Sequence, residues 1–174
     1  MRSRQFLFLA AFSAGVAVLG GAKPADGAIV TLGANLSGVQ ETTPNASPAT
    51  GIGMIVLDDV AKTIKVNESW SGLSAAASAS HIHTGAIGIS GPVTFPFTGV
   101  PAASAGAIPE QVFSVTPAQI ASLEAGQMYF NIHTSAFPGG EIRGQISVVP
   151  EPAMLGLLGT GVMALMARRR RAGV

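Results

Sequence analysis

Three histidines are the residues of this 174-residue chain whose type and spacing best suit chemistry. His81 and His83 are two positions apart in the segment SHIHT, and His133 lies in a second β-prone segment, MYFNIHT. Side chains two apart on a strand project from one face, so His81 and His83 share a face and Ile82 takes the other. In the same way, Tyr129, Asn131 and His133 share one face, and the apolar residues between them must face the core, so we expect the histidines on the opposite face. An H-x-H pair with a third histidine on another strand suits a transition metal, and imidazole favours copper or zinc.

Glu141 is the acidic residue best placed to support these histidines. It follows His133 across a predicted hairpin, in which residues 137–140 supply the Pro and Gly residues of the turn. Its carboxylate can complete the shell of a metal or orient a histidine ring. The alternative is that the three histidines are solvent-side polar residues that hydrogen-bond to the backbone or to Glu141.

The residue content, motifs and charge of the chain give little support for other kinds of chemistry. The chain has no cysteine, and neither a Ser-His-acid arrangement nor a phosphate-binding loop is evident. Residues 29–150 contain three basic and seven acidic side chains, a net charge of 3 − 7 = −4, whereas nucleic-acid binding needs a basic surface. We therefore expect a protein that is not an enzyme and does not bind nucleic acid.

Short β-prone segments separated by Pro, Gly and Ser residues position the histidines. An all-β fold is predicted, an antiparallel β-sandwich with one short helix. The expected strands cover residues 29–40, 51–57, 63–70, 81–83, 93–97, 111–115, 128–134 and 141–149.

The single expected helix begins after Thr116. Thr116 is a good N-cap, Pro117 suits the first helical position, and Gln119 completes a capping box. Gly126 can end the helix. The helix is short enough to serve as a connector.

The N-terminal end has the layout of a secretory signal peptide over residues 1–28 and predicts an N-terminal signal helix. Arg2 and Arg4 precede an uncharged apolar run over residues 6–20, and small residues follow. Cleavage after Ala22 and cleavage near Ala28 both fit, and an uncleaved N-terminal anchor is the alternative.

The C-terminal end, residues 149–174, predicts a short transmembrane helix. Residues 153–167 are uncharged, and as a helix they measure about 22 Å, against about 30 Å for the hydrocarbon core of a bilayer. The four arginines that follow are expected to stay on the cytoplasmic side, as are Arg2 and Arg4 at the other end, which places residues 29–150 across the membrane. The marker residues of this tail are Pro150, Glu151, Pro152, Arg168, Arg169, Arg170 and Arg171.

This tail resembles the PEP-CTERM sorting signal, and an ordinary C-terminal anchor is the alternative. The resemblance implies a Gram-negative bacterium, export with signal peptidase, and transient anchoring in the inner membrane. It also implies processing by an exosortase, and then a place at the cell surface or outside the cell, often alongside exopolysaccharide.

The middle of the chain resembles the CHRD domain. The matching segments are ANLSGVQE at 34–41, ATG at 49–51, SHIHTG at 80–85, SGPV at 90–93 and YFNIHTSAFPGGEIRGQI at 129–146. The resemblance implies an extracytoplasmic β-sandwich of the immunoglobulin-like or superoxide-dismutase-like kind, over residues 29–148. The histidine pattern is similar to the copper site of Cu,Zn superoxide dismutases, an analogy that assigns no function by itself.

Two hypotheses about function follow. The leading one is a non-enzymatic surface or matrix protein that interacts with surface proteins or exopolysaccharide. The alternative is an extracytoplasmic domain that binds copper or zinc through His81, His83 and His133, with Glu141 in support.

Overall fold

The computed structural model describes residues 29–150, and the structural statements below concern these residues. The expected signal peptide at 1–28, the expected helix at 153–167 and the arginine cluster lie outside them. Within 29–150, no helix has the length and apolar character needed to cross a membrane.

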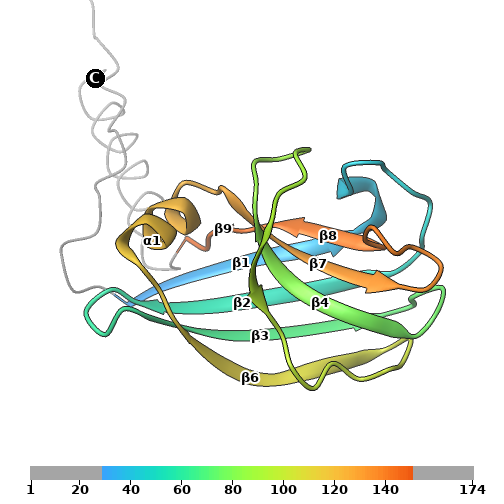
Figure 1. Cartoon of the computed structure of the whole chain (residues 1–174), viewed down its shortest axis with the longest axis horizontal. Helices are drawn as coiled ribbons and strands as arrows, with labels where there is room; N and C mark the ends of the chain where they lie inside the picture. The colour runs from blue at the N-terminus through green and yellow to red at the C-terminus, as the bar shows by residue number, and fades with distance from the viewer. Residues whose placement is uncertain (1–28, 151–174) are drawn as a thin grey trace, which may run out of the picture.

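Nine antiparallel strands form one continuous sheet (Figure 1). The strand order is β5-β4-β7-β8-β1-β2-β3-β6, and β9 pairs with β1 beside β8. The strands are β1 (Ile29–Ser37), β2 (Thr50–Asp58), β3 (Thr63–Ser71), β4 (Ala77–Thr84), β5 (Val93–Pro96), β6 (Gly106–Ser114), β7 (Met128–Thr134), β8 (Ile142–Gln145) and β9 (Ser147–Val148). A single turn of 3-10 helix, η1 (Gly38–Gln40), follows β1.

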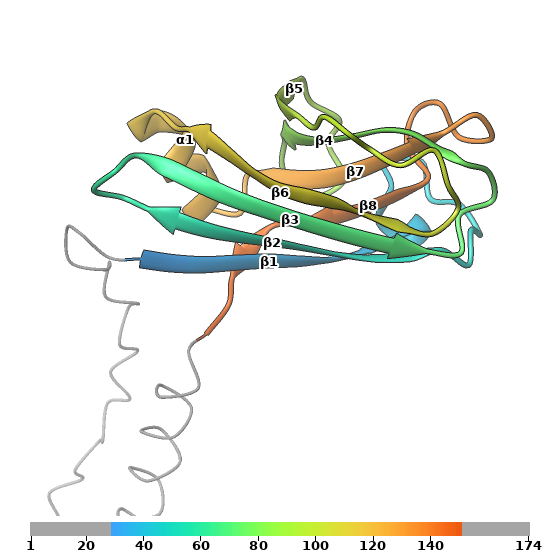
Figure 2. The ribbon, with the colours of Figure 1, turned by 90° about the horizontal axis from the view of Figure 1, so that it is seen from below.

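The sheet curls until its two halves face each other across one apolar core (Figure 2). Gly53 on β2 lies against the ring of Phe130 on β7, so closely that a Cβ on Gly53 would stand 2.5 Å from that ring. Between β3 and β4, Ser80 donates a hydrogen bond of 2.5 Å to Glu68 across the same core. The predicted all-β, antiparallel fold is therefore confirmed, but the strands form a single, nearly closed sheet in place of the two separate sheets of the expected sandwich.

Alternation of apolar and polar residues explains why β2 and β3 form where they were expected. Buried and exposed side chains alternate along both strands, and the two pair residue for residue from Thr50↔Ser71 to Asp58↔Thr63. The turn between them places Lys62 at a φ of 54°. One face of this hairpin therefore packs on the core, as its period of two predicts.

The predicted helix is confirmed as α1 (Pro117–Glu124). The Thr116 hydroxyl accepts a hydrogen bond from the Gln119 backbone, and the Gln119 side chain accepts one from the Thr116 backbone. Gly126 follows the helix with a φ of +66°, a conformation that favours glycine. The helix contributes Ile120 and Leu123 to the core.

Two strands extend into segments that were expected to be loops. β4 starts at Ala77, inside a stretch of small residues, and β6 starts at Gly106 although Pro109 lies within it. The pairing of β6 with β3 passes from Gln111 to Ile108 with a shift in register, so Pro109 lies in a bulge. A bulge removes the need for a ladder hydrogen bond, which is why proline is tolerated there.

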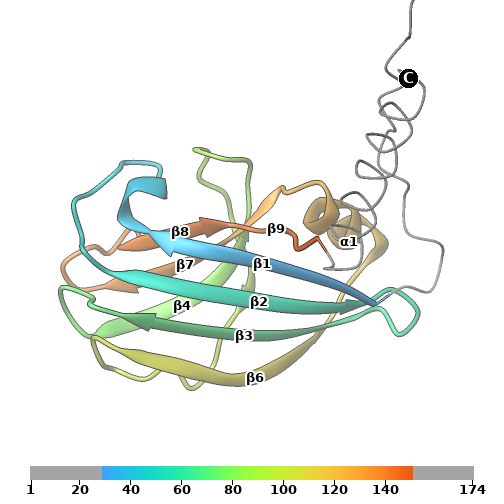
Figure 3. The same ribbon diagram turned by 180° about the vertical axis from the view of Figure 1, so that it is seen from behind.

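The two ends of the described domain lie together (Figure 3). β9 pairs with β1 at Leu32↔Val148, and the Val149 backbone donates to Thr31. The loops over residues 41–49 and 135–141 lie at the opposite end of the sheet. These two loops border the site described next.

Candidate metal centre

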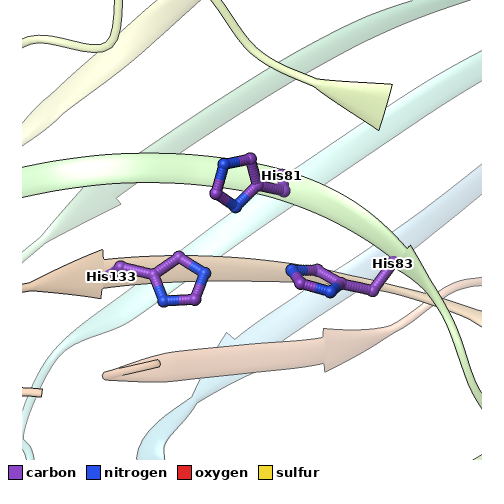
Figure 4. A group of neighbouring side chains, drawn as sticks. All are labelled: His81, His83 and His133. Carbon is purple, nitrogen blue, oxygen red and sulfur yellow. The ribbon is translucent and has the colours of Figure 1, made fainter. Parts of the chain in front are cut away.

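Strands β4 and β7 bring the three histidines together on the outer side of the sheet (Figure 4). The two strands pair with His81 opposite Asn131 and with Ala79 opposite His133. Ile82 and Ile132, which alternate with the histidines, are fully buried in the core. The expected division into a histidine face and an apolar face is confirmed, and the period of two explains it.

The histidine rings converge closely enough to share one ion. One ring nitrogen from each residue lies within 4.8 Å of the other two. The ring centroids are 5.1 Å apart for His81 and His133, 5.5 Å for His81 and His83, and 6.0 Å for His83 and His133. Metal–nitrogen bonds are about 2.0–2.1 Å long, so small ring movements would close the three nitrogens around an ion.

Main-chain carbonyl groups set the tautomers of two of the rings. Nδ1 of His83 donates to the carbonyl oxygen of Gly91 at 2.9 Å, and Nδ1 of His133 donates to that of Pro138 at 3.0 Å. A carbonyl oxygen only accepts, so Nδ1 carries the hydrogen and Nε2 keeps its lone pair. This outer-shell bond to a carbonyl group is typical of metal-binding histidines.

Each ring also has a buried nitrogen without a hydrogen-bond partner in the described part of the chain. These nitrogens are Nε2 of His83, Nε2 of His133 and Nδ1 of His81. Leaving a buried polar atom unpaired costs about 1–3 kcal/mol, so three in one place need an explanation. A shared metal ion would satisfy all three lone pairs.

The electrostatics of the site keep the rings neutral. Burial, followed by the proximity of His133 and His83, lowers the pKa of His81 to about 4. Burial also lowers the pKa values of His83 and His133, although their bonds to the carbonyl groups oppose this effect. Only the neutral imidazole binds a metal, so the site is ready for one at neutral pH.

A stacked pair fixes the position of His83. Its ring lies parallel to that of Tyr129, with centroids 5.0 Å apart and 9° between the planes. The guanidinium carbon of Arg143 lies 3.5 Å from the centre of the Tyr129 ring. Alternation along β7 indicated that Tyr129 shares the face of His133, but this stacking could not be read from the sequence.

Glu141 lies outside the histidine group, which corrects its expected place in the metal shell. Its carboxylate accepts hydrogen bonds from the Ser47 hydroxyl, from the Ser74 backbone and hydroxyl, and from the Thr134 hydroxyl, at 2.6–2.8 Å. Burial raises the pKa of Glu141, but these hydrogen bonds outweigh it and hold the pKa below its usual value. The residue joins three segments of the chain, and its oxygens are already occupied.

A pocket of about 370 Å³ lies beside the histidine group and contains an acidic residue that the sequence did not single out as functional. His83, Tyr129, Asn131 and Glu41 line it, together with the 136–140 turn. Glu41 accepts two hydrogen bonds from the Asn131 amide nitrogen, at 3.2 and 3.3 Å. Burial raises the pKa of Glu41 to about 7, against the opposing effect of the Asn131 bond.

Comparison with protein families gives two matches along the chain. The CHRD domain model matches residues 32–146, and the PEP-CTERM protein-sorting motif matches residues 148–171. The second match includes all the marker residues of the tail, from Pro150 to Arg171. No curated protein and no solved structure matches the chain significantly. The chain therefore belongs to the CHRD domain family and carries a PEP-CTERM sorting motif after that domain.

Proposed function

We propose that this protein is an exported, exosortase-sorted surface protein whose CHRD domain binds one transition-metal ion. The observation that carries the proposal is the group of three ring nitrogens, from His81, His83 and His133, within 4.8 Å of one another. Copper and zinc are the candidate ions because imidazole suits both. The analogy with the copper site of Cu,Zn superoxide dismutases makes copper the first ion to test.

The sorting motif supports an extracytoplasmic location, since PEP-CTERM motifs are processed by exosortases. The proposal adds a signal peptide over residues 1–28 and a transient membrane helix over residues 153–167. It also adds release at the cell surface of a Gram-negative bacterium. An intact arginine cluster on the mature surface protein, measured by mass spectrometry of its C-terminus, would contradict this route.

The proposed role is binding and not catalysis. The histidine group can hold an ion, but a complete catalytic arrangement is not evident in residues 29–150. Interaction with surface proteins or exopolysaccharide, the leading hypothesis from the sequence, stays a prediction.

Metal titration of the purified full-length protein tests the proposal. We expect one equivalent of copper or zinc per chain, measured by elemental analysis after removal of free metal. The variants His81→Ala, His83→Ala and His133→Ala should each weaken binding at least about tenfold, since each removes one of three ligands. Asn67→Ala, an exposed change on β3, is the control and should leave affinity unchanged. Absence of stoichiometric metal, or equal affinity in all four variants, would overturn the proposal.

A further inference from the structure

The pocket beside the histidine group contains a buried hydrogen-bond acceptor that has no donor among the described residues. Oδ1 of Asn131 is buried, lacks a partner among the described residues and belongs to a side chain that lines the pocket. Asn131 is 4% exposed, so it is shielded from bulk solvent. The carboxylate of Glu41, which is 8% exposed, lines the same pocket. Oδ1 of Asn131 and the Glu41 carboxylate are therefore suited to a ligand that donates hydrogen bonds.

The orientation of Asn131 follows from its contacts. Its amide nitrogen donates to both carboxylate oxygens of Glu41, which leaves Oδ1 as its free atom. Gly140 covers the pair, at a φ of +130°, and a Cβ at that position would collide with Asn131 and Glu41. A glycine in this conformation makes room for the two acceptors side by side.

Arg143 does not neutralise these acceptors by direct contact. Its guanidinium nitrogens donate to the Thr42 hydroxyl, to the carbonyl groups of Ala86 and Ile89, and to the side chain of Gln145. Arg143 therefore lowers the pKa of Glu41 through its charge, without a hydrogen bond to it. None of the described residues donates to Oδ1 of Asn131, which leaves this atom available to a bound ligand.

The same acceptors adjoin the histidine group. On the outer face of the sheet, Asn131 lies opposite His81 and two positions from His133, and His83 pairs with the neighbouring Tyr129. His83 lines the pocket with Asn131. Three imidazole ligands leave at least one position of a tetrahedral metal open, and such a position takes an external ligand.

We propose that this pocket binds a small neutral ligand, water or a primary amine, as the exchangeable ligand of the metal, with Glu41 and Asn131 as its acceptors. The inference rests on the proposed metal binding. The lone pair of the ligand binds the ion, and its two O–H or N–H groups donate to Glu41 and to Oδ1 of Asn131. A ligand without such hydrogens would leave Oδ1 of Asn131 unsatisfied and would add no hydrogen bond to Glu41, and hydrogen-bonding sites penalise such ligands strongly.

The experiment uses copper-loaded full-length protein at about pH 8, where Glu41 is largely ionised. Trifluoroethylamine, a weakly basic primary amine that is neutral under these conditions, is titrated against its N,N-dimethyl analogue. The analogue keeps the lone pair but has no N–H group. Binding is followed by the copper d–d absorption band and by electron paramagnetic resonance. We expect the primary amine to bind at least about tenfold more tightly, because only the primary amine can donate hydrogen bonds to Oδ1 of Asn131 and to the Glu41 carboxylate.

Variants separate hydrogen bonding from the smaller size of the primary amine. Asn131→Ala and Glu41→Ala should reduce the preference to less than about threefold, because each removes one acceptor. Glu41→Gln preserves shape and should retain part of the preference if the alanine variants fold poorly. Asn67→Ala, the exposed change on β3 outside the pocket, should leave the preference unchanged.

The outcomes distinguish this inference from the proposed function. Normal copper binding without a preference for the primary amine, or with a preference that all the variants retain, would overturn the inference alone. Failure to bind either copper or zinc would overturn the proposed function and, with it, the exchangeable ligand.

Discussion

At the scale of single residues, the histidines illustrate what a sequence can and cannot reveal. The alternation in SHIHT and MYFNIHT predicted that all three histidines project from the face opposite the core. The hydrogen bonds that set the ring tautomers could not be predicted, because the acceptors are main-chain carbonyl groups of Gly91 and Pro138 in loops. A main-chain carbonyl group can belong to any residue type, so only the structure shows these two hydrogen bonds.

The same scale explains the misplacement of Glu141. Its position after the hairpin turn brought it near His133 in the chain, but Ser47 and Ser74 lie 94 and 67 residues away and hold its carboxylate. Long-range partners of this kind leave no pattern in the sequence. Glu41, which does line the pocket, appeared only as part of a family segment with no role attached.

The role of Glu141 can be tested by Glu141→Gln. An amide cannot accept all four of the present hydrogen bonds, and its NH₂ group would face donors. We expect the free energy of unfolding to fall by about 2–4 kcal/mol, given about 1.5–3 kcal/mol for each hydrogen bond to a charged group. Metal affinity of the folded protein should change by less than about threefold. Urea denaturation and metal titration check the two quantities, with the exposed Glu110→Gln as control. A large loss of metal affinity with normal stability would return Glu141 to the metal site.

At the scale of elements, local rules predicted the parts that local residues determine. Thr116, Pro117 and Gln119 determine where α1 begins, and the alternation of β2 and β3 determines their faces. The starts of β4 and β6 depend on partners far along the chain, since β3 pairs with β6 and β7 with β4. The composition predicted loops at both starts, but pairing with these distant strands extends β4 and β6 into them.

The close approach of β2 and β7 leads to a prediction at this scale. Gly53→Ala places a methyl group against the ring of Phe130, in a core that has no space for it. Overpacking of this kind typically costs about 1–3 kcal/mol, which we expect as a lower midpoint of thermal or urea unfolding. Phe130 lies between Tyr129 and Asn131 on β7, the strand that also carries His133. We therefore expect a weaker metal affinity together with the lower stability. Gly139→Ala, where a Cβ would meet no atom within 4 Å, is the matched control. Equal stability of the two variants would contradict the packing of β2 against β7.

At the scale of the whole molecule, a buried carboxyl group makes stability depend on pH. Glu68 is 2% exposed, and burial raises its pKa to about 8, against the opposing effect of the Ser80 bond. Between its unfolded value near 4.5 and about 8, the folded state holds a proton that the unfolded state has released. Stability therefore falls as the pH rises through this range, with Glu41 adding to the fall up to about 7. The histidines act in the opposite sense, but only below about pH 6.5.

We therefore expect the metal-free protein to lose stability between about pH 6.5 and pH 8. One proton gives a slope of up to about 1.4 kcal/mol per pH unit. Urea denaturation at several pH values measures this slope. Glu68→Gln should remove most of it, because the amide stays neutral in both states, whereas Glu110→Gln should not. Stability that rises with pH over this interval, or a slope unchanged in Glu68→Gln, would show that Glu68 is ionised inside the core.

The shared end of the domain, where β9 pairs with β1, has a consequence for the orientation of the protein at the membrane. Ile29 follows the proposed signal peptide and Val149 lies at the start of the sorting motif, so both proposed tethers would attach at one pole of the domain. The loops that border the pocket occupy the other pole (Figures 1 and 3). If the tail inserts in the membrane as proposed, the pocket beside the histidine group would face away from the bilayer. Metal capture would then not need to wait for proteolytic release, and the protein could leave the membrane already loaded.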